Sequence, residues 1–187
     1  MRTRPFARAA TAAAFTLVLW QCGGGGDEGS RTAAAGRGAR VEACELVPKS
    51  EMETIVGASV ASTQGNFSEH TYTTPPSYTA SCMYLGERAV MLAVNYPAPR
   101  RQISSEQLAA QITEHLRSQV GSDPSTDELF KSIQVRPVTG LAGAAAEYEM
   151  MDQTTLEVHT GDHMLKVMAP SLDAARGVAG KALERLN

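Results

Sequence analysis

Two histidines on either side of a tight turn have the spacing in this chain that comes nearest to a metal site. His159 and His163 flank residues 160–162, and a three-residue hairpin loop would set the two imidazoles opposite each other on neighbouring strands. Asp162 could add a carboxylate oxygen. A metal site, however, needs three or four converging ligands held by further hydrogen bonds, and hairpin tips are often simply polar. The sequence therefore predicts no bound metal, with His159 and His163 as weak candidates and two solvated histidines as the alternative.

Other catalytic patterns do not occur in the sequence. None of the serines lies in the glycine-flanked pattern of a nucleophile elbow, and no phosphate-binding loop or dinucleotide fingerprint is present. His70 lies in a polar stretch and His115 on the polar side of an expected helix, so both are expected at the surface. We therefore expect no enzyme activity, no catalytic residue and no cofactor.

The N-terminus has the composition of an export signal. Residues 1–8 are basic and residues 9–20 are apolar but too short to span a bilayer. This apolar run leads directly to Cys22 and a tract of four glycines, residues 23–26. That arrangement resembles a bacterial lipoprotein signal, although Gln21 stands where such signals usually carry a small residue.

The cysteine count agrees with this interpretation. The chain has three cysteines, an odd number for an exported protein. If residues 1–21 are a signal peptide and Cys22 carries lipid, then Cys44 and Cys82 remain as a disulfide pair in an oxidising compartment. We accordingly expect an exported protein, anchored to a membrane through its lipid and facing the periplasm or the cell exterior. The alternative is an ordinary secretory signal cut nearby, which would leave Cys22 as a free thiol.

Charge and composition divide the rest of the chain. Removal of the signal takes away Arg2, Arg4 and Arg8, so the mature protein has 14 basic and 20 acidic residues and a net charge of about −6. The mature sequence therefore has no basic patch that would indicate nucleic-acid binding. Residues 22–40 are rich in Gly, Ala and charge, which predicts a flexible tether. Residues 41–187 have the length of one domain.

Hydrophobic periodicity predicts the elements of this domain. Period-two alternation is clearest in residues 89–96, which should form a hairpin with residues 80–84, and the strongest hairpin signal is at residues 156–168. The remaining predictions are helices at 47–57, 104–120 and 172–186, a weak strand at 58–64, an exposed loop at 65–78, and strands at 133–135 and 144–151. Because hairpins dominate, we predict an α+β domain with an antiparallel sheet and helices packed on one face.

Two groups of side chains are candidates for contact with a partner. The predicted loop at 65–78 carries four residues of types that favour recognition, Phe67, His70, Tyr72 and Tyr78. The equally weighted alternative is that its aromatic rings fold back on the sheet. The methionines at 150, 151, 164 and 168 could line an adaptable surface, although at strand spacing methionines are more often part of the core.

Three short segments resemble a recurrent domain of uncharacterised bacterial envelope lipoproteins. The first runs from Cys44 through an acid-bearing helix to Gly57, and the second is Cys82 followed by Tyr84. Residues 138–145 are similar to a glycine-rich segment of that group, with departures at Ala142 and Gly143. The resemblance implies an exported lipoprotein with a disulfide and an α+β fold. Because the group has no settled activity, it supplies no catalytic residues.

These observations favour one functional class without identifying a ligand. The leading hypothesis is a lipid-anchored protein of the cell envelope that binds another protein or an envelope component without catalysis. The alternative is a periplasmic inhibitor or immunity-type protein that occludes an enzyme or toxin, because a compact, acidic and disulfide-linked domain suits that role.

Overall fold

The computed structural model describes residues 40–71, 76–98, 102–118 and 132–186, which all belong to one compact unit. The predicted signal peptide, Cys22 with its predicted lipid, the tether up to residue 39, and Tyr72 lie outside the described residues. Four helices are described: α1 (Ala43–Leu46), α2 (Lys49–Val56), α3 (Ser105–Ser118) and α5 (Leu172–Leu186). None of them has the length and apolar character to cross a membrane.

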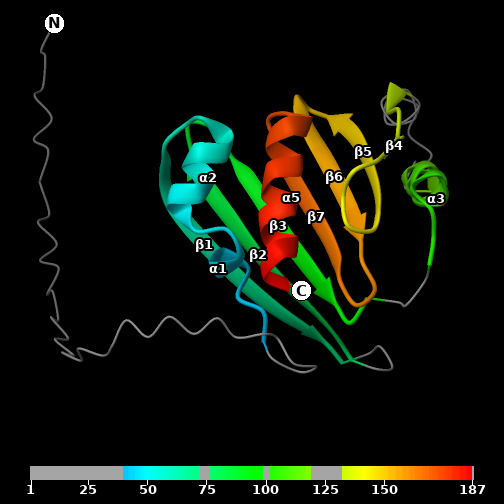
Figure 1. The fold of residues 1–187 in the computed structure, drawn as a ribbon, viewed down its shortest axis with the longest axis horizontal. Coiled ribbons are helices and arrows are strands. Elements are labelled where there is room, and N and C mark those ends of the chain that lie inside the picture. Colours follow the sequence, from blue (N-terminus) through cyan, green and yellow to red (C-terminus); the bar gives the residue numbers. More distant parts are fainter. Residues whose placement is uncertain (1–39, 72–75, 99–101, 119–131, 187) are drawn as a thin grey trace, which may run out of the picture. The chain divides into compact units, whose positions relative to one another are not determined.

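The strands form one antiparallel sheet in the order β1-β2-β3-β7-β6-β5-β4 (Figure 1). Their bounds are β1 (Val60–His70), β2 (Ser77–Gly86), β3 (Val90–Tyr96), β4 (Arg136–Val138), β5 (Ala144–Met150), β6 (Gln153–His159) and β7 (Met164–Ala169). Each strand pairs with its chain neighbour except at the centre, where β3 pairs with β7. The predicted α+β class with an antiparallel sheet of hairpins is confirmed.

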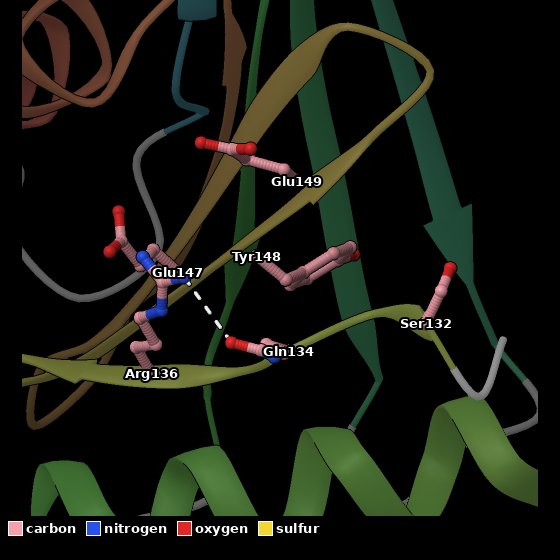
Figure 2. A pocket seen from close by; sticks show the side chains of 6 residues that line it. All are labelled: Ser132, Gln134, Arg136, Glu147, Tyr148 and Glu149. Carbon is pink, nitrogen blue, oxygen red and sulfur yellow. Dashed lines mark hydrogen bonds between the residues drawn. The ribbon is translucent and has the colours of Figure 1, made fainter.

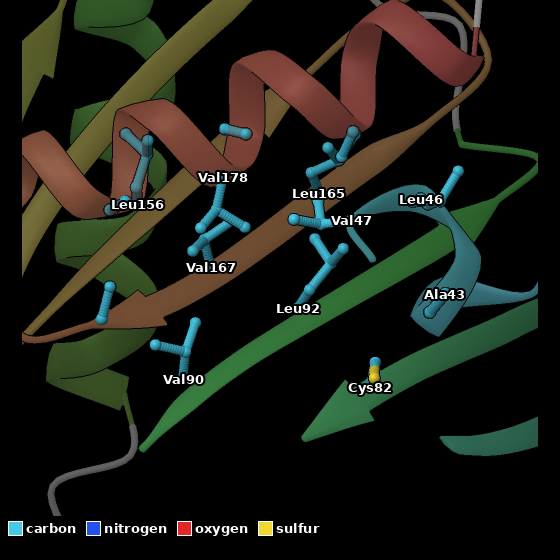
Figure 3. Close-up of a cluster of buried hydrophobic side chains, with 14 of the residues drawn as sticks. Ala43, Leu46, Val47, Cys82, Val90, Leu92, Leu156, Leu165, Val167 and Val178 are labelled. Carbon is cyan, nitrogen blue, oxygen red and sulfur yellow. The ribbon is translucent and has the colours of Figure 1, made fainter. Parts of the chain in front are cut away.

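The main core lies between one face of this sheet and the helices α1, α2 and α5 (Figure 3). Strand residues alternate between faces, so every second side chain of β3, β6 and β7 points into this core. The fully buried side chains from these strands include Leu92, Leu156 and Val167, and Val178 of α5 packs against the same core. We call this side of the sheet the covered face.

Helix α3 departs from the predicted arrangement, because it packs on the other side of the sheet. Its Leu108 and Ile112 form a second buried cluster with Ala144, Ala146 and Tyr148 of β5. Those three residues alternate along β5 with Ala145, which belongs to the main core. The prediction that all helices pack on one face is therefore wrong for α3, because its apolar stripe packs into a separate small core on the other side of the sheet.

Strand β1 also differs from the prediction. It continues to His70 and pairs with β2 from Ser77 onwards, so most of the predicted loop at 65–78 is strand. Residues 61–66 of β1 are exposed, because it is the outer strand of the sheet. A strand whose side chains are mostly exposed needs no alternation of apolar residues, so the hydrophobic pattern did not indicate this part of β1. The predicted strand at 133–135 likewise lies a few residues later, at β4.

A disulfide joins Cys44 of α1 to Cys82 of β2, with 5.0 Å between the two Cα atoms. Cys82 is fully buried in the main core. The bond attaches the first helix to the second strand across 38 residues of sequence. The pairing expected from the cysteine count is present in the structure.

Candidate binding surface

On the face of the sheet opposite α5, the described helices leave side chains of several strands accessible. Helix α3 packs there against β4 and β5, at one end of the sheet (Figure 1). Over β1, β2, β3 and β7, none of the described helices covers this side. We call this part of the sheet the open face. Its residues follow from the strand registers, in which paired residues point to the same side.

Three methionines lie side by side on the open face. Met83 of β2 pairs with Met91 of β3, and Met91 pairs with Met168 of β7. Met83 is 41% exposed, whereas Met91 and Met168 are half-buried. We call these three residues the methionine row. Because methionine is flexible and polarisable, an accessible row of this kind can adapt to apolar partners of different shapes.

Hydrogen-bonding side chains occupy the other end of the open face. The Thr79 hydroxyl donates to Asn95 Oδ1 over 2.5 Å, and Thr79 Oγ1 lies 3.0 Å from His70 Nε2. A hydroxyl has one proton, so Thr79 must accept from His70, whose Nε2 therefore carries a hydrogen. The strands thus hold three polar side chains in fixed orientations at the end of the open face away from the methionine row.

The charges between these two ends are paired. Lys166 Nζ lies 3.4 Å from Glu157 Oε1 and 5.9 Å from the ring centre of Tyr148. Burial opposes the charged lysine, but attraction to Tyr148 and Glu157 outweighs it, and the pKa of Lys166 is raised. This ion pair leaves the surrounding surface without a net charge of its own. Such a surface suits a neutral partner better than a nucleic acid.

Two of the predicted contact residues lie on the covered face instead. Phe67 stacks on Tyr78 with 5.9 Å between ring centres, and Tyr78 lies 5.4 Å from Tyr96. The Arg40 guanidinium lies 4.3 Å above the Phe67 ring, and the Val41 N–H donates to the Tyr96 hydroxyl over 3.0 Å. These aromatic rings therefore hold the start of the domain against the sheet.

The four predicted contact residues consequently do not form one surface. Phe67 and Tyr78 are together on the covered face, where Phe67 packs against the main core. His70 pairs with Ser77 on the opposite, open face. Tyr72 lies outside the described residues. The alternative that the aromatic rings fold back on the sheet describes Phe67 and Tyr78 correctly.

The two histidines considered for a metal point to opposite faces. His159 pairs with Met164 on the side away from α5. His163 precedes Met164 and lies 6.1 Å from the Tyr96 ring on the covered side. Burial lowers the pKa of both imidazoles, against the opposing influence of Glu157 on His159 and of Asp162 on His163. The expected geometry, with the two imidazoles facing each other, is wrong.

A shallow groove lies beside β4 and β5 (Figure 2). Its volume is about 300 Å³, and Gln134, Arg136, Glu147 and Tyr148 are among its lining residues. Arg136 donates to the Gln134 side chain over 3.3 Å. Within the described part of the chain, no group of three or more His, Cys, Asp or Glu residues could hold a metal ion. The side chains that line the groove are polar and could contact a partner.

Comparisons with known proteins assign no family to this chain, so the candidate site rests on the geometry of the sheet. No family model matches the chain, and a search of curated proteins found no match either. The methionine row was not singled out by sequence reasoning as a site. Alternation along residues 90–96 does place Met91 on the polar side, but only the β3–β7 pairing brings Met168 next to it.

Proposed function

We propose that this chain is a non-catalytic binding protein of the cell envelope that holds a protein partner on its open face. The observation that carries the proposal is the methionine row, an accessible apolar strip on a sheet whose other face is covered by helices. The His70, Thr79 and Asn95 side chains, at the other end of the open face, would orient the partner through hydrogen bonds. The partner is expected to present a neutral, partly apolar surface, because the positive charge of Lys166 on the open face is paired with Glu157.

Several features support an envelope location for this function. The N-terminal sequence has the export and lipidation pattern described above, and the Cys44–Cys82 disulfide is compatible with an oxidising compartment. The described chain begins at Arg40, which contacts Phe67 of β1. Arg40 and Phe67 therefore lie on the covered side of the sheet, away from the open face. Lipidation of Cys22 and the periplasmic or exterior location are part of the proposal.

Site-specific crosslinking in the native envelope tests the proposed surface. A photoreactive amino acid is placed at Met83 in the tagged full-length protein, and crosslinked products are identified by mass spectrometry. We expect one protein partner to crosslink in stoichiometric yield. The matched control carries the same group at Thr54, which is exposed on α2 on the covered side.

Comparison of the products at Met83 and Thr54 distinguishes a specific binding surface from non-specific crosslinking. Equal products from Met83 and Thr54, or none from Met83, would contradict a partner on the open face. A captured hydrolase or toxin whose activity falls on binding would assign the inhibitor role. A Cys22→Ser form run beside the others shows whether the partner is reached only from the membrane.

A further inference from the structure

The spacing of the three side chains in the methionine row brings their sulfur atoms within reach of one another. Neighbouring strands lie about 4.8 Å apart, and directly paired residues have Cβ atoms about 5 Å apart. Met83, Met91 and Met168 are paired in this way across β2, β3 and β7. Their three thioether groups therefore rise from adjacent positions on one side of the sheet. Flexible side chains at this spacing can converge on a single atom above Met91.

Thioether sulfur is a soft donor that carries no charge and no titrating proton. Soft sulfur ligands select Cu(I) over the hard cations that prefer carboxylate and water oxygen. We propose that the methionine row binds one Cu(I) ion through three thioether sulfurs, from Met83, Met91 and Met168. The proposal concerns binding alone and involves no change in the oxidation state of the metal.

The surroundings of the row suit a singly charged ion. Met83 is 41% exposed and gives solvent access, while Met91 and Met168 are half-buried. The nearest cationic residue along β7 is Lys166, two positions before Met168. Its charge is paired with Glu157 at 3.4 Å, which reduces repulsion of a bound cation. No cluster of His, Cys, Asp or Glu in the described residues offers a competing multidentate site.

This inference does not rest on the proposed protein partner. Leucine has nearly the volume and apolar character of methionine, so a Met→Leu change preserves the surface while removing the sulfur. Protein binding should therefore survive Met91→Leu, whereas metal binding should not. The two proposals can fail separately.

Ag(I), which is soft and stable in air, is the first probe. The full-length Cys22→Ser protein is titrated with Ag(I) against a competing chelator, and Cu(I) is then used under anaerobic conditions. We expect one equivalent to bind. Loss of a residue that only hydrogen-bonds to a metal ligand costs about 10- to 100-fold in affinity. Met91→Leu removes a ligand itself and should therefore weaken binding at least about tenfold. The matched control is Met151→Leu, at a methionine that is 78% exposed and outside the row.

Methyl signals of ¹³C-labelled methionine locate the ion directly. With one equivalent of Ag(I), the signals of Met83, Met91 and Met168 should shift together while the other five remain in place. Binding should be equally strong at pH 5.5 and 7.5, because thioethers do not titrate. A strong loss at pH 5.5 would instead indicate an imidazole such as His159 and overturn the proposal. The proposal would also be overturned if the signals of the methionine row did not shift, or if Met151→Leu weakened binding as much as Met91→Leu. If Met91→Leu fails to fold, the methyl titration of the unmodified protein still tests the proposal.

Discussion

The Tyr84 hydroxyl donates a 2.6 Å hydrogen bond to the carbonyl oxygen of Val47, and both residues are fully buried. Val47 lies between α1 and α2, whereas Tyr84 comes from β2. This bond and the Cys44–Cys82 disulfide join the same two regions of the chain. The turn between the first two helices is thus held to the sheet by one polar and one covalent link.

Replacement of Tyr84 by phenylalanine should destabilise the domain at neutral pH. The change removes the donor and leaves the buried Val47 carbonyl without its partner, at a cost of about 1–3 kcal/mol. Urea unfolding monitored by circular dichroism measures this difference. An unchanged unfolding midpoint would show that the carbonyl finds another donor.

Ionisation of the Tyr84 hydroxyl should lower the stability of the domain at alkaline pH. Burial raises the pKa of Tyr84 to about 12, with a smaller opposing effect of Arg185. In the unfolded chain a tyrosine has a pKa of about 10, so between these values the unfolded state releases a proton that the folded state keeps. Stability must then fall as pH rises through this window. The stability advantage of the wild type over Tyr84→Phe should shrink between pH 9 and pH 11.5, and a constant difference would contradict the assignment.

Removal of the disulfide should have a larger effect. The bond closes a loop of 38 residues that contains all of β1, and loss of such a bond typically costs about 2–5 kcal/mol. A Cys44→Ala/Cys82→Ala double variant avoids placing a new hydroxyl in the core. We expect its unfolding free energy to fall by this amount and to be insensitive to reductant. Reductant should bring the wild type down to the same value, and a wild type unaffected by full reduction would refute a stabilising role.

Two glycines of α5 provide a matched pair on one helix. A Cβ atom at Gly177 would come within 2.9 Å of Ile55 Cγ2 of α2, whereas one at Gly180 would meet nothing within 4 Å. Alanine is favoured over glycine in helices by about 1 kcal/mol. Gly180→Ala should therefore stabilise the domain by about that amount, while Gly177→Ala should gain less or lose stability. Thermal unfolding of the two variants distinguishes these cases, and equal gains would mean that Ile55 moves aside freely.

Local chemistry explains which parts of the fold could be predicted. Ser104 and Gln107 have the types and spacing of a capping box, and both of its reciprocal hydrogen bonds are present at the start of α3. Gly57 ends α2 in the left-handed conformation that glycine commonly adopts at this position, with a φ of 64°. Such features depend on residues three or four positions apart, so the sequence alone is sufficient to indicate them.

Features that depend on strand register could not be predicted in the same way. The Thr160 N–H bonds to the His163 carbonyl, so the hairpin loop contains only residues 161 and 162 rather than three residues. A register change of one residue moves a side chain to the other face of a sheet, which separates His163 from His159. The methionine row depends on the non-sequential pairing of β3 with β7. Only the assembled sheet brings its members together.

The ion pair between α2 and α5 gives a final prediction on acid stability. Arg185 Nη2 lies 2.6 Å from Glu51 Oε1, and Nη1 lies 3.0 Å from Oε2. The hydrogen bond from Arg185 lowers the pKa of Glu51. A carboxylate with a lowered folded pKa adds stability above its unfolded pKa of about 4.3, and this contribution disappears as pH falls through the folded value.

Glu51→Gln should therefore be less stable than the wild type at pH 7 and equal to it at about pH 2, where both side chains are neutral. Chemical unfolding at a series of pH values measures the difference. Glu114→Gln, at an exposed position of α3, is the control and should track the wild type throughout. A wild-type advantage over Glu51→Gln that persists unchanged into acid would mean that the α2–α5 contact depends on packing of the side chains and not on the carboxylate charge.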